Sequence, residues 1–517
     1  MRRWFTAFCL LVLTALPARA QVSDSAPGRR PPTSMLTLAE ALSQGRARSP
    51  DYLTVLNDAG PARWAVRNAY GSFLPSADVS GSMSYTGEGS STFGGSNFTQ
   101  TSPSLGSSYS IGLGWQFSGA TLAAPGTQKA NLRATEADID AARVNLTASI
   151  TDQYLTALAA MAQADAALVQ VARNQVFLDL ARARYQVGQA TLLDVRQAEV
   201  QKGNSDIALL RARQDETDQK LELFRRMGVP APADVEGVGL SNDFAVAEPH
   251  FGADSLVALA TAENPEYRAL RARGDAAKWS LRATRSRYLP SLSARAGWSG
   301  FTQEFTREET LVNNAFGSGL AAAENCRFQN DIITRLTSPL PPTYPNGGII
   351  ADCNAYAGLD ATGNALDPAV ERGILEANDQ FPFDFQSQPF QASLTVSLPI
   401  FTGFGRRLDM ARAKAAREDA EEAVRRTELQ LRALVQSRLG GVSTSYRAIA
   451  VQEANREAAR DQLRLAQDRY RLGSGTSLEL SDAQNAVSQA ETNYINAVYT
   501  YHRAFVALEA VVGRPLR

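Results

Sequence analysis

Two carboxylates lie three positions apart near the end of the chain, shortly after Thr476. Glu479 and Asp482 would share one face of a helix, because residues three apart are neighbours on a helix surface. Like charges held together attract cations and raise each other's pKa. A solvated helix face is the plain alternative, since acidic residues are common just after a helix N-cap. The residues alone leave both interpretations open.

Few other residues could do chemistry. The chain has two histidines, His250 in a linker and His502 on a predicted helix, and neither has a second metal ligand at helical spacing. We find no nucleophile elbow, zinc motif or phosphate loop. The formal net charge is −1, and nothing suggests a nucleic-acid surface. The sequence therefore predicts no enzyme, no bound metal, no cofactor and no nucleic-acid partner.

The N-terminus predicts export. Residues 1–20 combine two arginines, a short apolar run and an Ala-Arg-Ala ending, as signal peptides do, and the apolar run is too short to be a spanning anchor. Residues 21–34 predict a disordered tail. In an oxidising compartment Cys326 and Cys353 can form a disulfide, worth on the order of 3 kcal/mol by loop closure, or can stay free.

The acidic pair belongs to a duplicated segment. Residues 463–484 and 178–199 align without a gap at an offset of 285, and nine of the 22 positions are identical. Each copy predicts a helix that ends at a glycine, Gly473 or Gly188, followed by a short turn and a second helix that a threonine caps. The same helical hairpin is therefore expected twice.

The predicted helices are too long for an ordinary globular core. Residues 129–187 are rich in alanine and free of proline, which predicts a rod on the order of 90 Å long, and a second helix returns over 191–227. The counterparts in the second half run from about 406 to 472 and onward from 477. This last helix carries a seven-residue repeat typical of coiled coils, at Leu480, Val487, Tyr494, Tyr501 and Leu508.

Alternating segments predict β-hairpins between the helices. Apolar residues alternate with small polar ones over 77–85 and 109–117, and again over 292–298 and 390–398. Strands of roughly 9–11 residues with this alternation are typical of transmembrane β-barrels. A half-buried soluble hairpin is the alternative. The second pair encloses a long insertion, 301–389, which is expected on the extracellular side.

These elements divide the mature chain into two structural repeats. The first covers 35–228, with a β-hairpin at about 76–118 and a helical hairpin at 129–228. A Pro- and Gly-containing equatorial linker is expected at 229–251. The second repeat covers 252–517, with a β-hairpin at about 291–398 and a helical hairpin at 405–512.

This arrangement resembles the TolC-like outer-membrane efflux proteins. The resemblance covers nearly the whole mature chain and is carried by three short motifs, Arg184-Tyr-Gln-Val-Gly188, Arg469-Tyr-Arg-Leu-Gly473 and Leu398-Pro-Ile-Phe-Thr-Gly403. It implies an α+β membrane protein with four transmembrane strands per chain in a trimeric 12-stranded β-barrel. It also implies that the coiled-coil helices form a periplasmic α-barrel. Strand edges cannot stay open in lipid, which by itself requires an oligomer.

The resemblance also implies roles for residues of the hairpin tips. Glu479 and Asp482 match acids that ring the periplasmic gate, and Asp194 and Tyr470 match a pair that links hairpins in the closed state. An arginine that helps to lock some members aligns with Gly475 here. The turn residues match the site where a periplasmic adaptor docks: Val187, Gly188, Leu472 and Gly473.

The function implied is an exit duct in the cell outer membrane with a periplasmic helical extension. Such a duct belongs to a tripartite efflux or type I secretion system and is a passive channel, opened at its periplasmic tip by an adaptor and an inner-membrane pump. The alternative is a barrel-anchored structural or adhesive coiled-coil protein. A stalk of that kind would need neither the duplicated tip glycines nor the paired acids.

Overall fold

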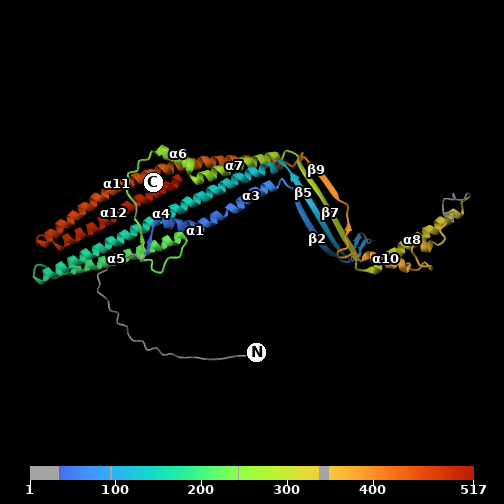
Figure 1. Ribbon diagram of the computed structural model, residues 1–517, viewed down its shortest axis with the longest axis horizontal. Helices are drawn as coiled ribbons and strands as arrows, with labels where there is room; N and C mark the ends of the chain where they lie inside the picture. Colours follow the sequence, from blue (N-terminus) through green and yellow to red (C-terminus); the bar gives the residue numbers. More distant parts are fainter. Residues whose placement is uncertain (1–33, 94–95, 243, 337–347, 517) are drawn as a thin grey trace, which may run out of the picture. The chain divides into compact units, whose positions relative to one another are not determined.

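The computed structural model describes residues 34–93, 96–242, 244–336 and 348–516 (Figure 1). The predicted signal peptide and nearly all of the predicted tail lie outside the described residues. The chain forms two compact units. Unit 1 comprises the residues up to 59 together with 133–271 and 422–517, and unit 2 comprises 60–132 and 272–421.

The chain contains two helical hairpins of matching length, whose tips and return helices belong to unit 1. The first joins α4 (Gly119–Gln186) to α5 (Leu192–Met227), and the second joins α11 (Gly405–Arg471) to α12 (Ser477–Val512). Both return helices have 36 residues. The boundaries at the tip repeat at the offset of 285 residues found in the sequence.

The other ends of the return helices also match. Gly228 and Gly513 follow α5 and α12 with positive φ angles of 72° and 90°. A Cβ atom at Gly228 would lie 2.5 Å from the carbonyl oxygen of Arg48, and one at Gly513 would lie 3.0 Å from that of Glu263. Both positions therefore need glycine, because the backbone is left-handed and a second helix end approaches closely.

The helix ends that approach these glycines belong to two short helices, one at the start of each repeat. They are α1 (Leu38–Arg48) and α6 (Ala253–Glu263), each of 11 residues. Each is followed after one residue by a helix that begins with proline, α2 (Pro50–Asn57) or α7 (Pro265–Ser286). Proline suits the first helical position because its missing N–H would have no partner there.

The middle of α4 supplies a core of unit 1. By length and composition α4 could cross a membrane, with an 18-residue window of mean hydropathy 1.4. Its Tyr154, Leu155 and Leu158 are nevertheless fully buried within unit 1. The Tyr154 hydroxyl lies 2.8 and 2.9 Å from the carbonyl oxygens of Leu36 and Ser241, which share it as a donor. It thus ties α4 to a small parallel sheet of β1 (Ser34–Leu36) and β6 (Val238–Leu240).

The seven-residue pattern of α12 marks its buried face, as the spacing predicts. Leu480, Val487, Tyr501 and Leu508 are all at most 2% exposed, whereas Tyr494 is only partly buried. The tip half of this seam packs in one apolar cluster with residues of the first hairpin, and the other half packs with α6 and α11.

Unit 2 is built on an antiparallel sheet of four main strands. Its order is β2 (Ser76–Thr86), β5 (Ser104–Phe117), β7 (Ser291–Phe305) and β9 (Gln391–Ser397), with a two-residue strand β8 (Gln386–Ser387) also on β7. The helix α3 (Ala59–Gly71) precedes β2. Among the described strands, β2 pairs only with β5, and β9 pairs only with β7.

The two faces of this sheet differ as the alternation predicts. On one face the hydroxyls of Ser80 and Ser110, two directly opposed residues, lie 2.8 Å apart. On the other face the large apolar side chains are exposed, with Val79 77% and Trp298 50% exposed in the single chain. An exposed apolar face on strands of this length fits contact with lipid.

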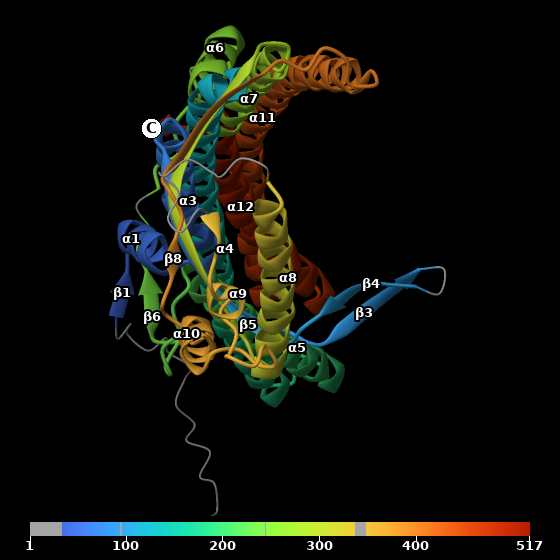
Figure 2. The same ribbon diagram turned by 90° about the vertical axis from the view of Figure 1, so that its right-hand side faces the viewer.

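Two segments differ from their expected structure. The loop between the first two barrel strands contains a separate hairpin of β3 (Gly89–Phe93) and β4 (Ser96–Thr101), which projects away from the sheet (Figure 2). The helix α4 begins at Gly119, about ten residues before the predicted start, and includes Pro125. Tertiary packing explains the early start. The first turns of α4 pack closely on Trp279 of α7, since a Cβ at Gly126 would lie only 2.4 Å from the Trp279 ring.

The insertion expected to be a long loop is also folded in its described part. It contains α8 (Glu308–Thr334), α9 (Cys353–Tyr356) and α10 (Pro368–Asn378). Cys326 and Cys353 form a disulfide that joins α8 to α9. A small core of buried residues lies beside the disulfide, at Ala323, Leu359 and Leu366. Gly and Asn residues lower the helix propensity of α8, but Gly319 has a packing role, since a Cβ there would lie 2.9 Å from the Leu359 side chain.

Candidate functional site at the hairpin tips

Both turns at the hairpin tips have the same construction. Gly188 and Gly473 have φ angles of 76° and 81°. In each turn the glycine N–H donates to the carbonyl three residues earlier, and the next N–H donates to the carbonyl five residues earlier. This is the Schellman motif, which satisfies the last carbonyls of a helix. It leaves Val187 and Leu472 pointing outward, 69% and 83% exposed.

The return helices begin with equivalent threonines that are capped differently. Thr191 and Asp194 form a full capping box, in which each side chain accepts from the other residue's backbone N–H. Thr476 accepts from the Glu479 N–H at 3.1 Å. The Glu479 carboxylate does not complete the box, because it forms an ion pair with Arg469 at 3.5 Å instead.

A polar contact joins the two hairpins beside the turns. The Ser477 hydroxyl lies 2.6 Å from Asp194 Oδ1 and donates to it, and it lies 2.8 Å from Gln197 Oε1. This hydrogen bond is the main cause that lowers the pKa of Asp194, and the bonds from Thr191 act in the same direction against partial burial. Asp194 therefore stays ionised and serves both its own helix cap and the second hairpin.

A second contact between the hairpins centres on the Tyr470 ring. The Arg184 guanidinium lies 4.7 Å from the ring centroid and also donates to the Tyr470 carbonyl oxygen. Phe177 meets the same ring edge to face at 5.6 Å. A cation over an aromatic face is attracted by the ring's quadrupole, most strongly where water is excluded. Tyr470 is only 4% exposed, so the contact is shielded.

Asp194 and Tyr470, the pair predicted to link the hairpins, both take part in these contacts. Burial raises the pKa of Tyr470, the charge of Asp194 adds to the rise, and Arg184 opposes it, so the three groups share one local field. The Tyr470 hydroxyl is buried and has no hydrogen-bond partner within the described part of the chain. Ser477 and Arg184 make the contacts observed between the hairpins beside the turns, and no sequence motif predicted this role for either residue.

The two acids of the predicted gate lie on the exposed side of α12. Glu479 and Asp482 are both exposed. Glu479 pairs with Arg469, whereas the Asp482 side chain forms no ion pair or hydrogen bond with any described residue. Within one chain these two carboxylates meet no other described acid, so a ring of acids needs further copies.

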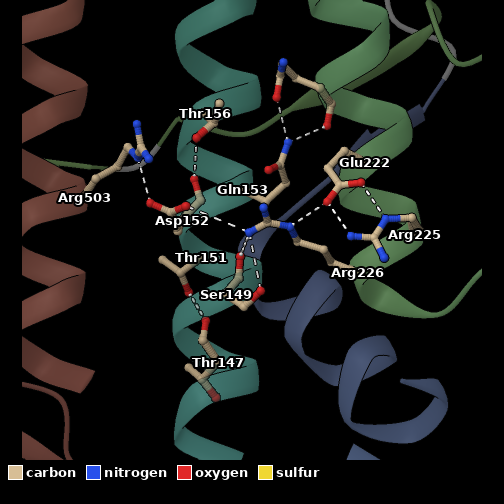
Figure 3. Close-up of polar contacts among 11 residues, drawn as sticks. Thr147, Ser149, Thr151, Asp152, Gln153, Thr156, Glu222, Arg225, Arg226 and Arg503 are labelled. Atoms are coloured by element: carbon tan, nitrogen blue, oxygen red, sulfur yellow. Dashed lines mark hydrogen bonds and ion pairs between the residues drawn. The ribbon is translucent and has the colours of Figure 1, made fainter. Parts of the chain in front are cut away.

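Farther from the tips, a polar network joins the hairpins (Figure 3). Arg503 of α12 pairs with Asp152 of α4 at 2.7 Å. Arg226 of α5 donates to the Ser149 carbonyl oxygen at 3.1 Å and pairs with Glu222. The hydrogen bonds from Arg225 and Arg226 lower the pKa of Glu222 to about 2. Together with the buried core of α4, this network holds the hairpins together at the end away from the tips.

No described residues form a group of three or more potential metal ligands. His250 is exposed. His502 is 1% exposed and lies between aromatic rings, 5.5 Å from Phe244 and 5.2 Å from Tyr501 by ring centroids. Neither histidine has an environment that resembles a metal site.

Solved structures with this fold are outer-membrane channels. The chain is similar to VceC from Vibrio cholerae, with a TM-score of 0.64 and 16% identity over 93% of this chain and 97% of that one. It is also similar to the open MtrE channel of Neisseria gonorrhoeae, with a TM-score of 0.61 and 17% identity over 93% and 89% of the two chains.

Sequence comparison agrees with the fold. The chain is 24% identical to the pyoverdine export outer membrane protein OpmQ of Pseudomonas putida over 436 residues, which are 84% of this chain and 76% of that protein. The profile of the outer membrane efflux protein family matches residues 41–229 and 360–514, and the second match begins within the insertion. The chain therefore belongs to the outer membrane efflux protein family: it is a passive exit duct of the outer membrane, a homotrimer that works with a periplasmic adaptor and an inner-membrane pump.

Proposed function

We propose that this exit duct is closed at its hairpin tips by the contacts between the two hairpins of each chain. The observation that carries the proposal is the pair of contacts beside the turns, Ser477 with Asp194 and Arg184 with Tyr470. Opening would separate the tips and break both contacts. The buried core and the network around Asp152 would hold the other end in place.

The free energies of these contacts suit a gate that must both close and open. A hydrogen bond to a charged acceptor contributes about 1.5–3 kcal/mol when shielded, and a cation–π contact about 0.5–2 kcal/mol. Three copies of such a pair would hold the tips closed without making the closed state irreversible. Binding energy from an adaptor, about −8.2 kcal/mol for a micromolar complex, is of the order needed to offset them.

Gly475 supports the role that we give to Arg184. The resemblance implies an arginine at position 475, but a Cβ there would lie 3.0 Å from the Tyr470 backbone nitrogen. The turn has no room for that side chain without rearrangement. Arg184, from the other hairpin, brings a guanidinium to the same tyrosine. We propose that it replaces the missing arginine in the closed state.

We further propose that Glu479 and Asp482 form the acid ring of this gate. Threefold symmetry would bring two carboxylates from each chain to the axis. Asp482 supports the idea, because its side chain is exposed and bonds to no described residue of its own chain. Arg469 would neutralise part of the charge of Glu479, so Asp482 would carry more of the attraction for cations.

The exposed turns are the proposed docking site for the adaptor. Val187 and Leu472 present apolar side chains to solvent next to the left-handed glycines Gly188 and Gly473. Apolar groups this exposed are favourable to cover, at roughly 25 cal/mol per Å² of buried area. The glycines would serve both as helix caps and as places where a partner backbone can approach.

The gate is tested by removing both contacts at once. We expect Arg184→Ala together with Ser477→Ala to raise the single-channel conductance of purified trimers in planar bilayers several-fold, because the tips then lose both contacts beside the turns. Tyr470→Phe should leave the conductance nearly unchanged, because the ring remains and the hydroxyl has no hydrogen-bond partner among the described residues.

Arg182→Ala is the matched control. Arg182 lies two residues from Arg184 but pairs with Glu199 of its own hairpin at 3.0 Å. We expect its removal to leave conductance unchanged. Equal conductance of the Arg184→Ala, Ser477→Ala double variant and the native channel would contradict the proposed closure.

A further inference from the structure

The helix α8 of the insertion has one face covered and one face bare. The covered face carries Ala323 and Cys326, which pack with Leu359 and with the disulfide partner. The opposite face carries Phe328 and Ile332, which are 63% and 45% exposed. An amphipathic helix normally has polar residues on the side away from its core, so this bare apolar face needs a partner.

Hydrogen bonds fix the first residues of α8 at the end of the sheet. Arg307, just before α8, makes two hydrogen bonds to the Glu88 carboxylate at 3.0 and 2.8 Å. The Thr306 N–H donates to the Pro103 carbonyl oxygen at 3.0 Å. Asn378, at the end of α10, bonds both backbone groups of Phe305. These bonds therefore hold α8 in a fixed position relative to β7.

The insertion returns to the sheet on its apolar face. The Ser107 hydroxyl donates to the Pro382 carbonyl oxygen at 2.5 Å, and the Phe385 ring meets Tyr109 at 4.9 Å. Tyr109 is two residues from Ile111 in the same strand, so both share the face that contacts lipid. The preceding helix α10 packs on the covered face of α8 through Ile374. If the apolar face of the sheet meets lipid, the bare face of α8, which lies opposite the side on which α10 packs, would be directed over the lumen.

The dimensions of the barrel allow the three bare faces to meet. Twelve strands about 4.8 Å apart and tilted by about 40° give a radius of about 12 Å. A 27-residue helix is about 40 Å long at 1.5 Å per residue. A lean of roughly 10° would bring its far end within the 8–10 Å interaxial distance of packed helices.

The distribution of residues along this face agrees with a lean toward the axis. Near the root of α8 the face carries Asn314 and Gly317, and Asn325 lies on it farther along. The large apolar residues come only in the last two turns. Ala321 and Phe328 are seven residues apart, and Ile332 follows four later, which is coiled-coil spacing. The apolar contacts would thus form where the helices are closest.

We propose that the exposed faces of α8 from three copies of this chain pack together on the threefold axis, as a collar above the outer mouth of the barrel. The collar continues the trimer interface that the open strands β2 and β9 already require. It rests on the trimeric assembly and not on the proposed periplasmic gate, so either can fail without the other. A collar of this kind would narrow the extracellular exit of the duct.

Cross-linking of single cysteines tests the collar. Phe328→Cys and Ile332→Cys are made separately in the full chain, and intact outer membranes are treated with a short bismaleimide. Cys326 and Cys353 are in the disulfide and do not react. We expect covalent dimers on reducing, denaturing gels from both variants, because two of three symmetric thiols become linked.

Gln329→Cys is the matched control, since Gln329 is exposed but lies about 100° around the helix from Phe328. It should cross-link several-fold less. Trimers are checked on native gels, and the Ile332→Cys variant guards against an effect of replacing Phe328. Intact trimers in which neither Phe328→Cys nor Ile332→Cys cross-links more than Gln329→Cys would overturn the proposal.

Discussion

At the scale of single residues, Arg184 and Tyr470 show how one contact can be rebuilt from different positions. An Arg-Tyr pair occurs at the same place in both copies of the hairpin, as Arg184-Tyr185 and Arg469-Tyr470. In the structure the two arginines have different partners, because Arg184 reaches across to Tyr470, whereas Arg469 pairs with Glu479. The local sequence does not reveal this difference in partners, because it depends on how the two hairpins pack against each other.

The acids of the proposed gate lead to a prediction at the same scale. Carboxylates held together bind divalent cations more tightly than single ones do. We expect millimolar divalent cations to block the native channel in planar bilayers, and the block to be lost in Glu479→Gln with Asp482→Asn. The amides keep the size of the side chains and remove only the charge.

A control for the acids is available on the same helix. Glu491 lies farther from the tip on α12 and pairs with Arg460 at 2.5 Å. Glu491→Gln should retain the block by divalent cations. Block that persists unchanged in the doubly amidated variant would rule out an acid ring at positions 479 and 482.

At the scale of elements, periodicity predicted most of the fold. The seven-residue spacing of α12 and the alternation in the four main strands were enough to identify both elements, together with the buried face of the helix and the apolar face of the strands. The tip glycines and threonines gave the helix boundaries, because caps depend on local backbone chemistry. The helices of the insertion and the early start of α4 were missed. Their stability comes from a disulfide and from contacts such as Gly126 with Trp279, which act between distant residues.

The disulfide of the insertion gives a prediction at this scale. It closes a separation of 27 residues, and in the chain-entropy model such closure stabilises by on the order of 3 kcal/mol. We expect Cys326→Ser with Cys353→Ser to make the insertion unfold locally about 100-fold more often, since about 1.4 kcal/mol is a factor of ten. The measurement is the rate of limited proteolysis within the insertion, in intact outer membranes.

The barrel itself provides the reference for this experiment. Cleavage outside the insertion and the yield of trimer should not change, because the strands are held by pairing and not by the disulfide. An unchanged proteolysis rate in the serine variant would mean that the disulfide does not hold α8 and α9 together.

At the scale of the whole molecule, one chain is incomplete. Among its described strands the outer two, β2 and β9, each have a single neighbour, and most large side chains on the apolar face of the sheet are exposed. Unpaired strand edges are not tolerated in lipid, where each unsatisfied backbone group costs several kcal/mol. The proposed acid ring and the proposed collar also need other copies. Self-association around a hollow axis therefore satisfies the sheet, the tips and the insertion together.

The most direct test measures mass and ionic current on the same purified sample. Light scattering in detergent should give the mass of three chains, and the same fraction should carry discrete current steps when it is added to a planar bilayer. A monomer that carries no current would contradict the account.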